Sequence, residues 1–352
     1  MSVNTILILY AEIMPYNVAT FNSLLNKYED FVLHVVSWGT DKKLTKYEQP
    51  THNKIKYYDK SKLSYIDLLS LYKLIDPKLL LISGRMEKDY LKLALLARRE
   101  DKIVVGTSDN HYIGNIKQKI VALFSNFLYK RYFEYMLVPG IYQYEYQRKL
   151  GFDRNRIIFP LYCANTTLFE NSFLQNSTSK REGILFLGRL HPIKGIEMLI
   201  DVHKKLYESK KINDKLIVIG DGILKDKLNL NDKNITYYSF MDQTDIIKIM
   251  SQVKYFCLPS KSEPWGVVIH EAAAAGLPIV TTSNCGAATA FVKQGYNGYL
   301  FESENKKELE SVLLKMNNKT KEEIALMGKR SFDLSKQIHP EMWAESLMNL
   351  ID

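Results

Sequence analysis

The 352-residue sequence has few cysteines and lacks the long apolar runs of membrane-spanning segments. Its three cysteines, Cys163, Cys257 and Cys285, stand far apart, which excludes the usual spacing of a disulfide framework or a zinc site. No apolar run reaches the roughly 20 residues that a membrane-spanning helix needs. The apolar start, residues 5–10, has no basic residue before it, so we interpret it as a buried strand and not as a signal peptide. These absences favour a protein of the reducing cytoplasm.

The sequence also lacks enough acid to balance its lysines, and its formal net charge is +9. Residues 1–170 hold 24 Lys and Arg against 17 Asp and Glu, a balance of +7, whereas residues 171–352 hold 24 against 22, a balance of +2. The basic N-terminal half predicts an anionic partner, such as a lipid surface or an acidic acceptor, although a solvated lysine-rich surface is the simpler explanation. We expect no nucleic-acid partner, because the lysines are scattered and no recognition motif is present.

Strand-like and helix-like segments alternate along the chain, which has 46% apolar and 25% charged residues. Short apolar runs such as residues 6–10, 103–106 and 184–187 indicate buried strands, and residues 88–99 and 196–209 have a helical pattern. The alternation predicts an α/β protein whose parallel sheets are covered by helices on both faces. Ligands of such sheets bind at the carboxyl ends of the strands.

The polar stretch 171–181 has no periodicity, and it is the predicted linker between two doubly wound, Rossmann-like domains. We expect residues 1–170 to form the first domain and residues 171–335 the second. Residues 336–352 are expected to form a C-terminal helix. The two domains are expected to face a central cleft.

Two carboxylates, Glu263 and Glu271, stand eight positions apart around a predicted helix start. Pro264 and Gly266 lie between them, so one acid precedes the helix and the other lies inside it. A carboxylate in a cleft binds sugar and ribose hydroxyls, because it accepts two hydrogen bonds from a vicinal diol. The alternative is that the two acids serve only as a helix cap and as a partner in the core.

Cationic residues follow the predicted strand 184–187. Gly188 allows a close turn, and Arg189 and Lys194 place two positive charges before the next helix, whose amino end also favours anions. This arrangement suits a diphosphate, and a solvated surface turn is the alternative.

Two further turns are candidates for ligand contact. Gly220 and Gly222 follow a strand, but without a third glycine they indicate a tight turn as readily as a phosphate site. The amides of Trp265, Gly266 and Val267 at the helix start are predicted hydrogen-bond donors to hydroxyl groups. The Trp265 ring is either a stacking platform or ordinary packing.

In combination, these motifs resemble the family 4 glycosyltransferases, retaining enzymes with the two-domain GT-B fold. The resemblance rests on Gly-Arg-Leu at 188–190 with Lys-Gly at 194–195, on Gly-Asp-Gly at 220–222, and on the segment from Glu263 to Val280. It extends over roughly residues 180–335 and is looser before them.

The resemblance implies a role for each motif residue. Arg189 and Lys194 would hold the donor diphosphate and stabilise the leaving group, Glu263 would contact the transferred sugar, and Glu271 would bind the ribose. Main-chain groups after a strand would meet the base, and the C-terminal helix would cross back onto the first domain. The donor-binding residues that we expect are Gly188, Gly220, Gly222, Ser239, Phe240, Pro264, Trp265, Gly266, Val267 and Glu271.

No metal or other cofactor is expected, since Asp-x-Asp, the metal-holding pair of the other large glycosyltransferase fold, is missing. In the first domain the loop 11–17 has no glycine, unlike that of many relatives. Asp109, followed by His111, stands where many relatives have a histidine, so either residue is a candidate to touch the sugar or to accept the acceptor's proton. An Asp/Asn-rich turn without a catalytic role is the alternative.

The predicted helix 116–132 has basic ends around the apolar centre 120–124. This pattern suits a helix at a membrane surface, but we expect an ordinary amphipathic core helix instead. A peripheral contact of the N-terminal domain with an anionic membrane remains the second expectation.

The sequence therefore predicts a cytoplasmic, metal-independent retaining glycosyltransferase. It would transfer a sugar from a nucleotide diphosphate sugar, UDP first and GDP next, to a glycan or lipid-linked acceptor in cell-surface polysaccharide synthesis. The alternatives are a nucleotide-sugar epimerase of the same fold and a non-catalytic carbohydrate-binding protein. A dinucleotide-dependent oxidoreductase is a remote one, because the first strand lacks the Gly-x-Gly-x-x-Gly turn.

Overall fold

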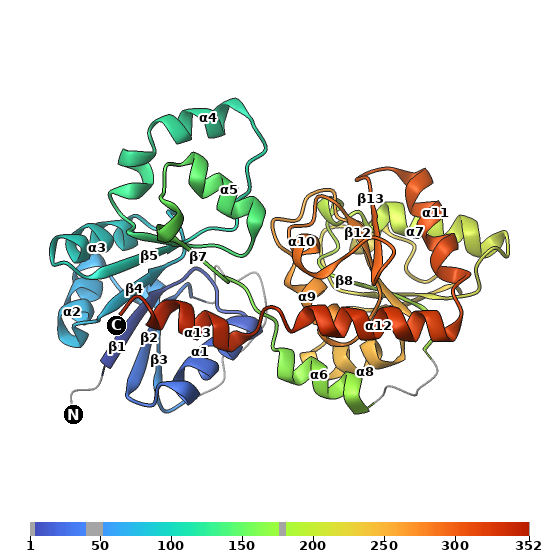
Figure 1. Ribbon diagram of the computed structural model, residues 1–352, viewed down its shortest axis with the longest axis horizontal. Helices are drawn as coiled ribbons and strands as arrows, with labels where there is room; N and C mark the ends of the chain where they lie inside the picture. The colour runs from blue at the N-terminus through green and yellow to red at the C-terminus, as the bar shows by residue number, and fades with distance from the viewer. Residues whose placement is uncertain (1–3, 40–51, 176–180, 352) are drawn as a thin grey trace. The chain divides into compact units, whose positions relative to one another are not determined.

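The computed structural model describes residues 4–39, 52–175 and 181–351 (Figure 1). The chain forms two compact units. The N-terminal unit contains Met1–Cys163 together with Pro340–Asp352, and the C-terminal unit contains Ala164–His339. Each unit is built around one parallel sheet, so the predicted α/β class with two doubly wound sheets is confirmed.

The sheet of the N-terminal unit has seven parallel strands in the order β3-β2-β1-β4-β5-β6-β7. Its strands are β1 Asn4–Leu9, β2 Phe31–Ser37, β3 Ile55–Asp59, β4 Leu79–Ile82, β5 Ile103–Thr107, β6 Tyr135–Leu137 and β7 Ile157–Ile158. Its helices are α1 Pro15–Lys27, α2 Tyr65–Ile75, α3 Lys88–Arg99, α4 Ile116–Leu123, α5 Ile141–Lys149 and α13 Pro340–Met348, with short helical turns η1 Lys60–Lys62, η2 Asn126–Lys130 and η3 Arg154–Arg156.

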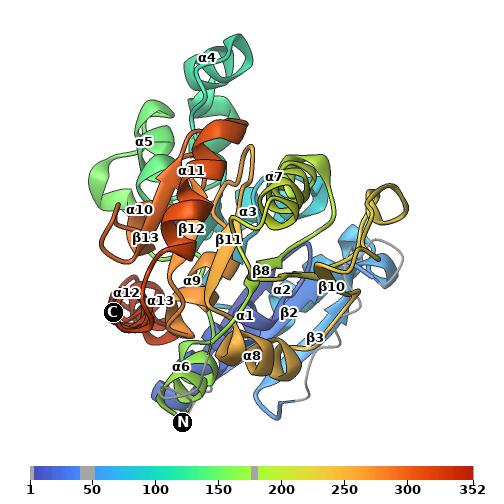
Figure 2. The same ribbon diagram turned by 90° about the vertical axis from the view of Figure 1, so that its right-hand side faces the viewer.

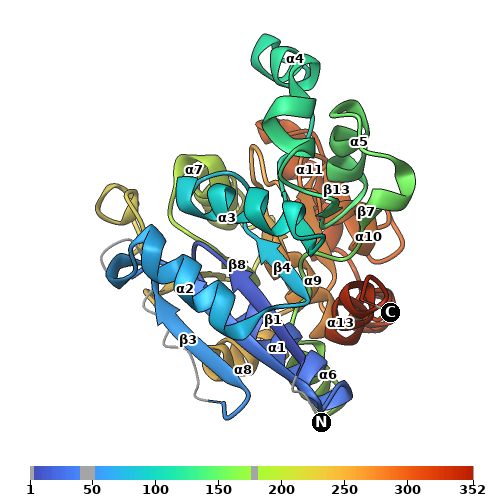
Figure 3. The same ribbon diagram turned by 90° about the vertical axis from the view of Figure 1, so that its left-hand side faces the viewer.

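Helices cover both faces of this sheet (Figures 1 and 3). Leu7 and Leu9 of β1 face a core that includes residues of α2 and α3, while α1 and α13 lie on the opposite face. Because both faces are buried, the central strands are continuous apolar runs, as is usual for parallel sheets. This is why the sequence pattern identified them.

The C-terminal unit has a six-stranded parallel sheet in the order β10-β9-β8-β11-β12-β13. Its strands are β8 Ile184–Leu187, β9 Leu216–Ile219, β10 Ile235–Tyr238, β11 Tyr255–Leu258, β12 Ile279–Thr282 and β13 Gly298–Phe301. Its helices are α6 Thr166–Gln175, α7 Ile196–Glu208, α8 Gln243–Gln252, α9 Val267–Ala274, α10 Ala288–Phe291, α11 Lys306–Asn317 and α12 Lys321–Ser335, with turns η4 Pro192–Lys194 and η5 Lys225–Lys227. In Figure 2, α7 and α11 lie on one side of the sheet, and α6 and α8 on the other.

The last helix, α13, belongs to the N-terminal unit and packs against α1 (Figure 1). The Trp343 ring is 1% exposed and lies 5.7 Å from the Phe21 ring, centroid to centroid. Lys27 forms ion pairs of 2.6 Å with Glu341 and Glu345. The aromatic contact holds this helix, because the exposed ion pairs contribute little.

The structure corrects the predicted linker 171–181. Residues 171–175 belong to α6, residues 176–180 lie outside the described part of the chain, and the two units are divided between Cys163 and Ala164 instead. The polar composition concealed an apolar pair: Phe169 is fully buried, and the Phe173 ring packs 4.5 Å from that of Phe332 in α12. This i, i+4 spacing marks one helix face.

The expectation of a single core helix over residues 116–132 is wrong. The α-helix ends at Leu123, and the π-helical turn η2 follows it. No residue of α4 is buried. The apolar run 120–124 suggested an interior position, but apolar side chains are also common on protein surfaces.

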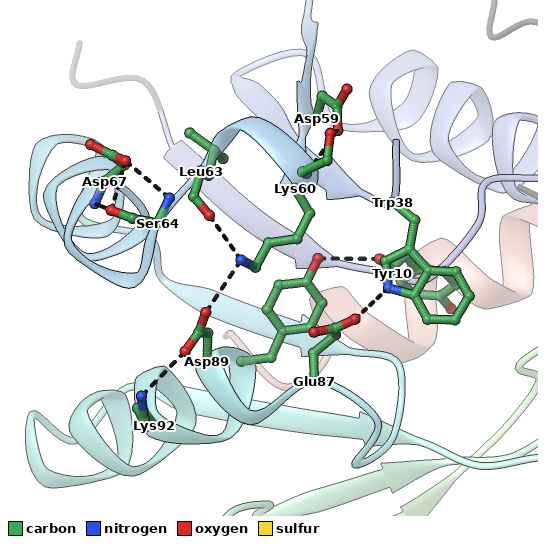
Figure 4. A network of polar contacts seen from close by, with 12 residues as sticks. Tyr10, Trp38, Asp59, Lys60, Leu63, Ser64, Asp67, Glu87, Asp89 and Lys92 are labelled. Atoms are coloured by element: carbon green, nitrogen blue, oxygen red, sulfur yellow. Dashed lines mark hydrogen bonds and ion pairs between the residues drawn. The ribbon is translucent and has the colours of Figure 1, made fainter. Parts of the chain in front are cut away.

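A polar network fixes the carboxyl edge of the N-terminal sheet (Figure 4). The Trp38 indole N–H, just after β2, donates to Glu87 Oε1 at 2.7 Å. Lys60, just after β3, donates to the Leu63 carbonyl at 2.9 Å and pairs with Asp89 at 3.3 Å. These contacts tie the ends of two strands to the start of α3, so the loops at this edge are held in place.

Candidate active site

Strand order in the C-terminal unit reverses at β8, which pairs with β9 on one side and β11 on the other. The carboxyl end of a sheet at such a point is where doubly wound folds bind ligands. Gly188 and Arg189 follow β8 directly, and Pro264 lies six residues after the end of β11. The fold therefore brings the predicted diphosphate and sugar motifs to the same edge.

Two backbone contacts place Lys194 next to the loop after β11. The Lys261 N–H donates to the Ile193 carbonyl at 2.8 Å. Gly195 has a left-handed φ of +68°, and a β-carbon there would lie 2.1 Å from the Pro259 carbonyl oxygen. Only glycine allows this approach, so the turn η4 is held against the loop that carries Glu263.

The side chains of Lys194 and Glu263 form an ion pair that is largely shielded from water. Glu263 is 8% exposed, and its backbone is fixed by bonds from its N–H to the Asn284 carbonyl and from the Gly286 N–H to its own carbonyl. Arg189 is exposed, and its side chain has no hydrogen bond or ion pair with any described residue. One cation of the pair predicted to hold a diphosphate is thus paired with the predicted sugar-binding acid, and the other is free to meet a ligand.

The turn at Gly220 and Gly222 is required by the fold. A β-carbon at Gly220 would lie 2.0 Å from the Gly188 carbonyl oxygen, and one at Gly222 would lie 2.5 Å from that of Leu190. This close packing supports the tight-turn interpretation, and direct ligand contact by these two glycines stays a prediction. Gly188 differs, because a β-carbon there would lie 3.7 Å from Phe186, the nearest described residue apart from its chain neighbours.

The structure assigns the Trp265 ring to packing, not to ligand stacking. The residue is 2% exposed, and its ring contacts Phe291 edge-on at 6.2 Å. The backbone N–H groups of Trp265, Gly266 and Val267, in contrast, donate to no described residue. Since these N–H groups stand at the start of α9, they are suited to bind hydroxyl or phosphate oxygens.

Glu271 lies in the second turn of α9 and is half-buried. Burial raises the pKa of its carboxyl group to about 7, and a hydrogen bond from Gln243 opposes this rise. The Gln243 Nε2 donates to Glu271 Oε1 at 3.4 Å. Ser239 and Phe240, predicted to meet the base, are exposed just after β10, at the same edge of the sheet.

His270, next to Glu271, is a residue that the sequence analysis missed. It is fully buried, its Nδ1 accepts from the Ala164 N–H at 3.0 Å, and its Nε2 donates to the Ser335 carbonyl at 3.0 Å. Burial lowers its pKa to about 4, so the ring stays neutral. His270 thereby ties α9 to the first residue and to one of the last residues of the C-terminal unit.

The two remaining candidates, Asp109 and His111, belong to the N-terminal unit and follow β5. Asp109 Oδ2 accepts a hydrogen bond from the hydroxyl of the half-buried Tyr162 at 3.2 Å, and the Asp109 carbonyl accepts one from Gln143 at 3.2 Å. Burial raises the pKa of Tyr162 well above its usual value, so its hydroxyl remains a donor. Of the two candidates, Asp109 is the one whose side chain the structure holds in place.

The missed partners Gln243 and Tyr162 share one recognisable property. Gln243 begins the helix after β10, and Tyr162 follows β7, so both lie beyond the carboxyl end of a strand. The rule that selected the loops after strands would have found them. Within the described ranges no group of three His, Cys, Asp or Glu side chains could hold a metal ion, and no helix could span a bilayer.

The sequence matches a known family over the C-terminal unit. Residues 169–329 match the family described as "Glycosyl transferases group 1". The chain is 34% identical over 129 residues to 2-deoxystreptamine N-acetyl-D-glucosaminyltransferase of Niallia circulans, covering 34% of the chain and 32% of that protein. It is 29% identical over 128 residues to the lipopolysaccharide glucosyltransferase WaaG of Escherichia coli, covering 35% and 33%. The matches to the first curated relatives span 30% to 46% of their lengths.

Solved structures are similar in fold to nearly the whole chain. The crystal structure of Anabaena Alr3699/HepE in complex with UDP and glucose matches with a TM-score of 0.71 at 14% identity, covering 98% of each chain. The fold is therefore GT-B, the class that the motifs predicted. Residues 169–329 match the group 1 glycosyltransferases, and the predicted resemblance to a glycosyltransferase of that kind is confirmed.

Proposed function

We propose that the protein is a retaining glycosyltransferase that transfers a sugar from a nucleotide diphosphate sugar to a hydroxyl group of a glycan. The observation that carries this proposal is the Lys194–Glu263 pair beside the unpaired Arg189 and the free amides at the start of α9. Together they provide positive charge for a diphosphate, next to a carboxylate that can accept hydrogen bonds from sugar hydroxyl groups. The family match supports it.

The proposed donor is a nucleoside diphosphate sugar, with UDP as the first choice and GDP as the second. The HepE structure is a complex with UDP and glucose, which favours UDP for this similar fold. Glu271 would bind the ribose diol through its carboxylate. Exposed main-chain groups at Ser239 and Phe240 would meet the base.

In the proposed mechanism the leaving diphosphate helps to remove the acceptor proton, and the acceptor attacks the same face of the sugar. Negative charge develops on the departing phosphate, and Arg189 and Lys194 stabilise it without a metal ion. One such contact is worth about 3 kcal/mol of barrier. Glu263 would hold the sugar hydroxyls, and its pairing with Lys194 links the sugar end of the donor to the phosphate end.

The proposed acceptor is a glycan or a lipid-linked glycan used in the synthesis of a cell-surface polysaccharide. The similarity to a lipopolysaccharide glucosyltransferase favours this setting. We place the reaction in the cytoplasm, at the cytoplasmic face of the membrane. Asp109, held by Tyr162, is the proposed contact for the sugar or the acceptor, with His111 beside it.

A thermal-shift panel of nucleotide sugars tests the donor class. A ligand that binds only the folded protein raises the melting temperature, by an amount that grows with its concentration over Kd. We expect one nucleotide sugar to raise it, and the same compound to support transfer to an acceptor. Release of an altered sugar without any acceptor would instead identify an epimerase.

Arg189→Ala is the sharpest test of the site. Because the Arg189 side chain has no partner among the described residues, its loss leaves no buried charge and should not alter the melting temperature of the free protein. We expect turnover to fall by at least a hundredfold. Lys248→Ala, at an exposed lysine on α8, is the matched control. Unchanged turnover in Arg189→Ala would rule out the proposed diphosphate contact.

A further inference from the structure

Helix α4 exposes an unusual number of large apolar side chains. Ile116, Ile120 and Leu123 are 75%, 53% and 78% exposed, and Phe127, in the turn that follows, is 68% exposed. Ile113, just before the helix, is exposed as well. In all three ribbon views α4 stands away from the sheet of its own unit (Figures 1–3). A contiguous apolar surface of this kind usually marks an interaction site.

The exposed side chains share one face of the helix. At about 100° per residue, Ile116, Ile120 and Leu123 fall within roughly 60° of one another. Val121 and Ala122, which point the other way on the helical wheel, pack against the core of the unit. The apolar face of α4 is therefore the outward one, the reverse of an ordinary surface helix.

Other contacts hold this face in place. The Gln118 side chain accepts hydrogen bonds from the Ile113 and Gly114 N–H groups at 2.8 and 3.2 Å, and it donates to the His111 carbonyl at 2.8 Å. The Asn115 side chain caps the helix by accepting from the Gln118 N–H at 2.8 Å. The outward face is thus presented by an anchored helix.

The segment that carries the apolar face is rich in positive charge and contains no acid. Between Asp109 and Glu134 the sequence contains four basic residues and no Asp or Glu. These residues are Lys117, Lys119, Lys130 and Arg131, and all four are exposed. On the helical wheel Lys117 and Lys119 flank the stripe on either side. The surface combines an apolar centre with a cationic rim.

We propose that this face of α4 and η2, formed by Ile116, Ile120, Leu123, Phe127 and the four basic residues, docks on an anionic lipid surface. Apolar side chains would enter the boundary between headgroups and acyl chains, while the lysines and the arginine meet lipid phosphates. A second copy of the chain is a poorer occupant. In a two-fold dimer the same patch meets itself, which would bring the two cationic rims together.

Vesicle sedimentation tests this docking directly and does not depend on catalysis. We expect the full-length protein to bind vesicles of phosphatidylcholine mixed with phosphatidylglycerol, and to bind vesicles of phosphatidylcholine alone much more weakly. Lys117→Gln with Lys119→Gln should weaken binding to the anionic vesicles about 25-fold, since each basic residue contributes about fivefold. Added salt should reduce the difference between the two kinds of vesicle.

The apolar contribution has its own variant and control. Ile120→Gln with Leu123→Gln should weaken binding at least tenfold and leave the melting temperature unchanged, because neither side chain is buried. The matched control is Ile66→Gln with Leu74→Gln, two exposed apolar residues of α2 in the same unit, which should bind as the unaltered protein does. Equal loss in both pairs would overturn the proposal. So would wild-type binding by the α4 pair, or a concentration-dependent dimer that this pair dissolves.

Discussion

Gly188 offers a test in which the stability of the protein and its binding of the donor separate. A β-carbon at this position would lie 3.7 Å from Phe186 and 3.9 Å from Leu258, which is ordinary van der Waals contact, and φ is not left-handed. Gly188→Ala should therefore change the free energy of unfolding by less than about 0.5 kcal/mol, or raise it slightly by restricting the unfolded chain.

The added methyl group would nevertheless occupy the space beside Arg189 in which the proposed diphosphate lies. A phosphate oxygen close to the Gly188 backbone would be displaced, and its contacts with the turn would be lost. We expect the affinity for the nucleotide sugar to fall at least tenfold, which corresponds to about 1.4 kcal/mol. No described residue is close enough to require glycine here, so a loss of binding would come from the ligand.

Chemical denaturation and calorimetric titration with the nucleotide sugar measure the two effects separately. Gly220→Ala is the contrasting variant, since its β-carbon would lie 2.0 Å from the Gly188 carbonyl oxygen with φ at +148°. It should lose on the order of 3 kcal/mol of stability through overpacking and backbone strain. A stable Gly188→Ala protein that binds the donor as tightly as before would refute the placement of the diphosphate.

Three other predictions concern single side chains. Burial raises the pKa of Glu271 from 4.5 to about 7, so folding takes up a proton between these values and the free energy of unfolding falls as the pH rises through them. Glu271→Gln should accordingly raise the melting temperature near pH 8 but not near pH 4. An equal effect at both pH values would contradict the burial argument. In the unaltered protein, the affinity for the donor, measured by titration, should weaken below about pH 7 as the carboxylate is protonated. Tyr162→Phe removes the hydrogen bond to Asp109 and should lower kcat about tenfold with little change in the donor KM, and Tyr142→Phe, at an exposed tyrosine, should show neither change. Trp343→Ala should lower the free energy of unfolding, measured by chemical denaturation, by about 4 kcal/mol. Glu345→Ala, at an exposed ion pair, should lower it by less than about 1 kcal/mol. Similar losses in the two variants would show that α13 is not held by its aromatic contact.

The sequence identified strands that are buried on both faces and missed β3 and β7, the two strands at the ends of the N-terminal sheet. Runs such as Ile184–Leu187 are apolar throughout because helices cover both sides of the sheet. Strand β3, Ile55–Asp59, pairs with no described strand except β2 and has one buried residue, so its composition gives little signal. The α4 prediction failed for the opposite reason, because a run of apolar residues was taken to mean burial.

The rule that ligands bind beyond the carboxyl ends of parallel strands predicted which residues form the candidate site, but not the contacts between them. It selected Arg189, Lys194 and Glu263, which the fold brings to one edge of the sheet. The pairing of Lys194 with Glu263 joins residues 69 positions apart and depends on how closely Gly195 approaches its neighbour. The spacing of residues in the sequence does not show that two backbone segments approach so closely. Nor did it show whether the Trp265 ring packs inside the protein or contacts a ligand.

The position of α13 affects the order in which the chain can fold. Domains usually fold as units and in the order of their synthesis, but here the residues that cover α1 are translated only after all of Ala164–His339. Until then the surface that receives Trp343 stays open to water. The half that leaves the ribosome first is thus the last to be completed, and during that interval it is the part most exposed to chaperones and proteases.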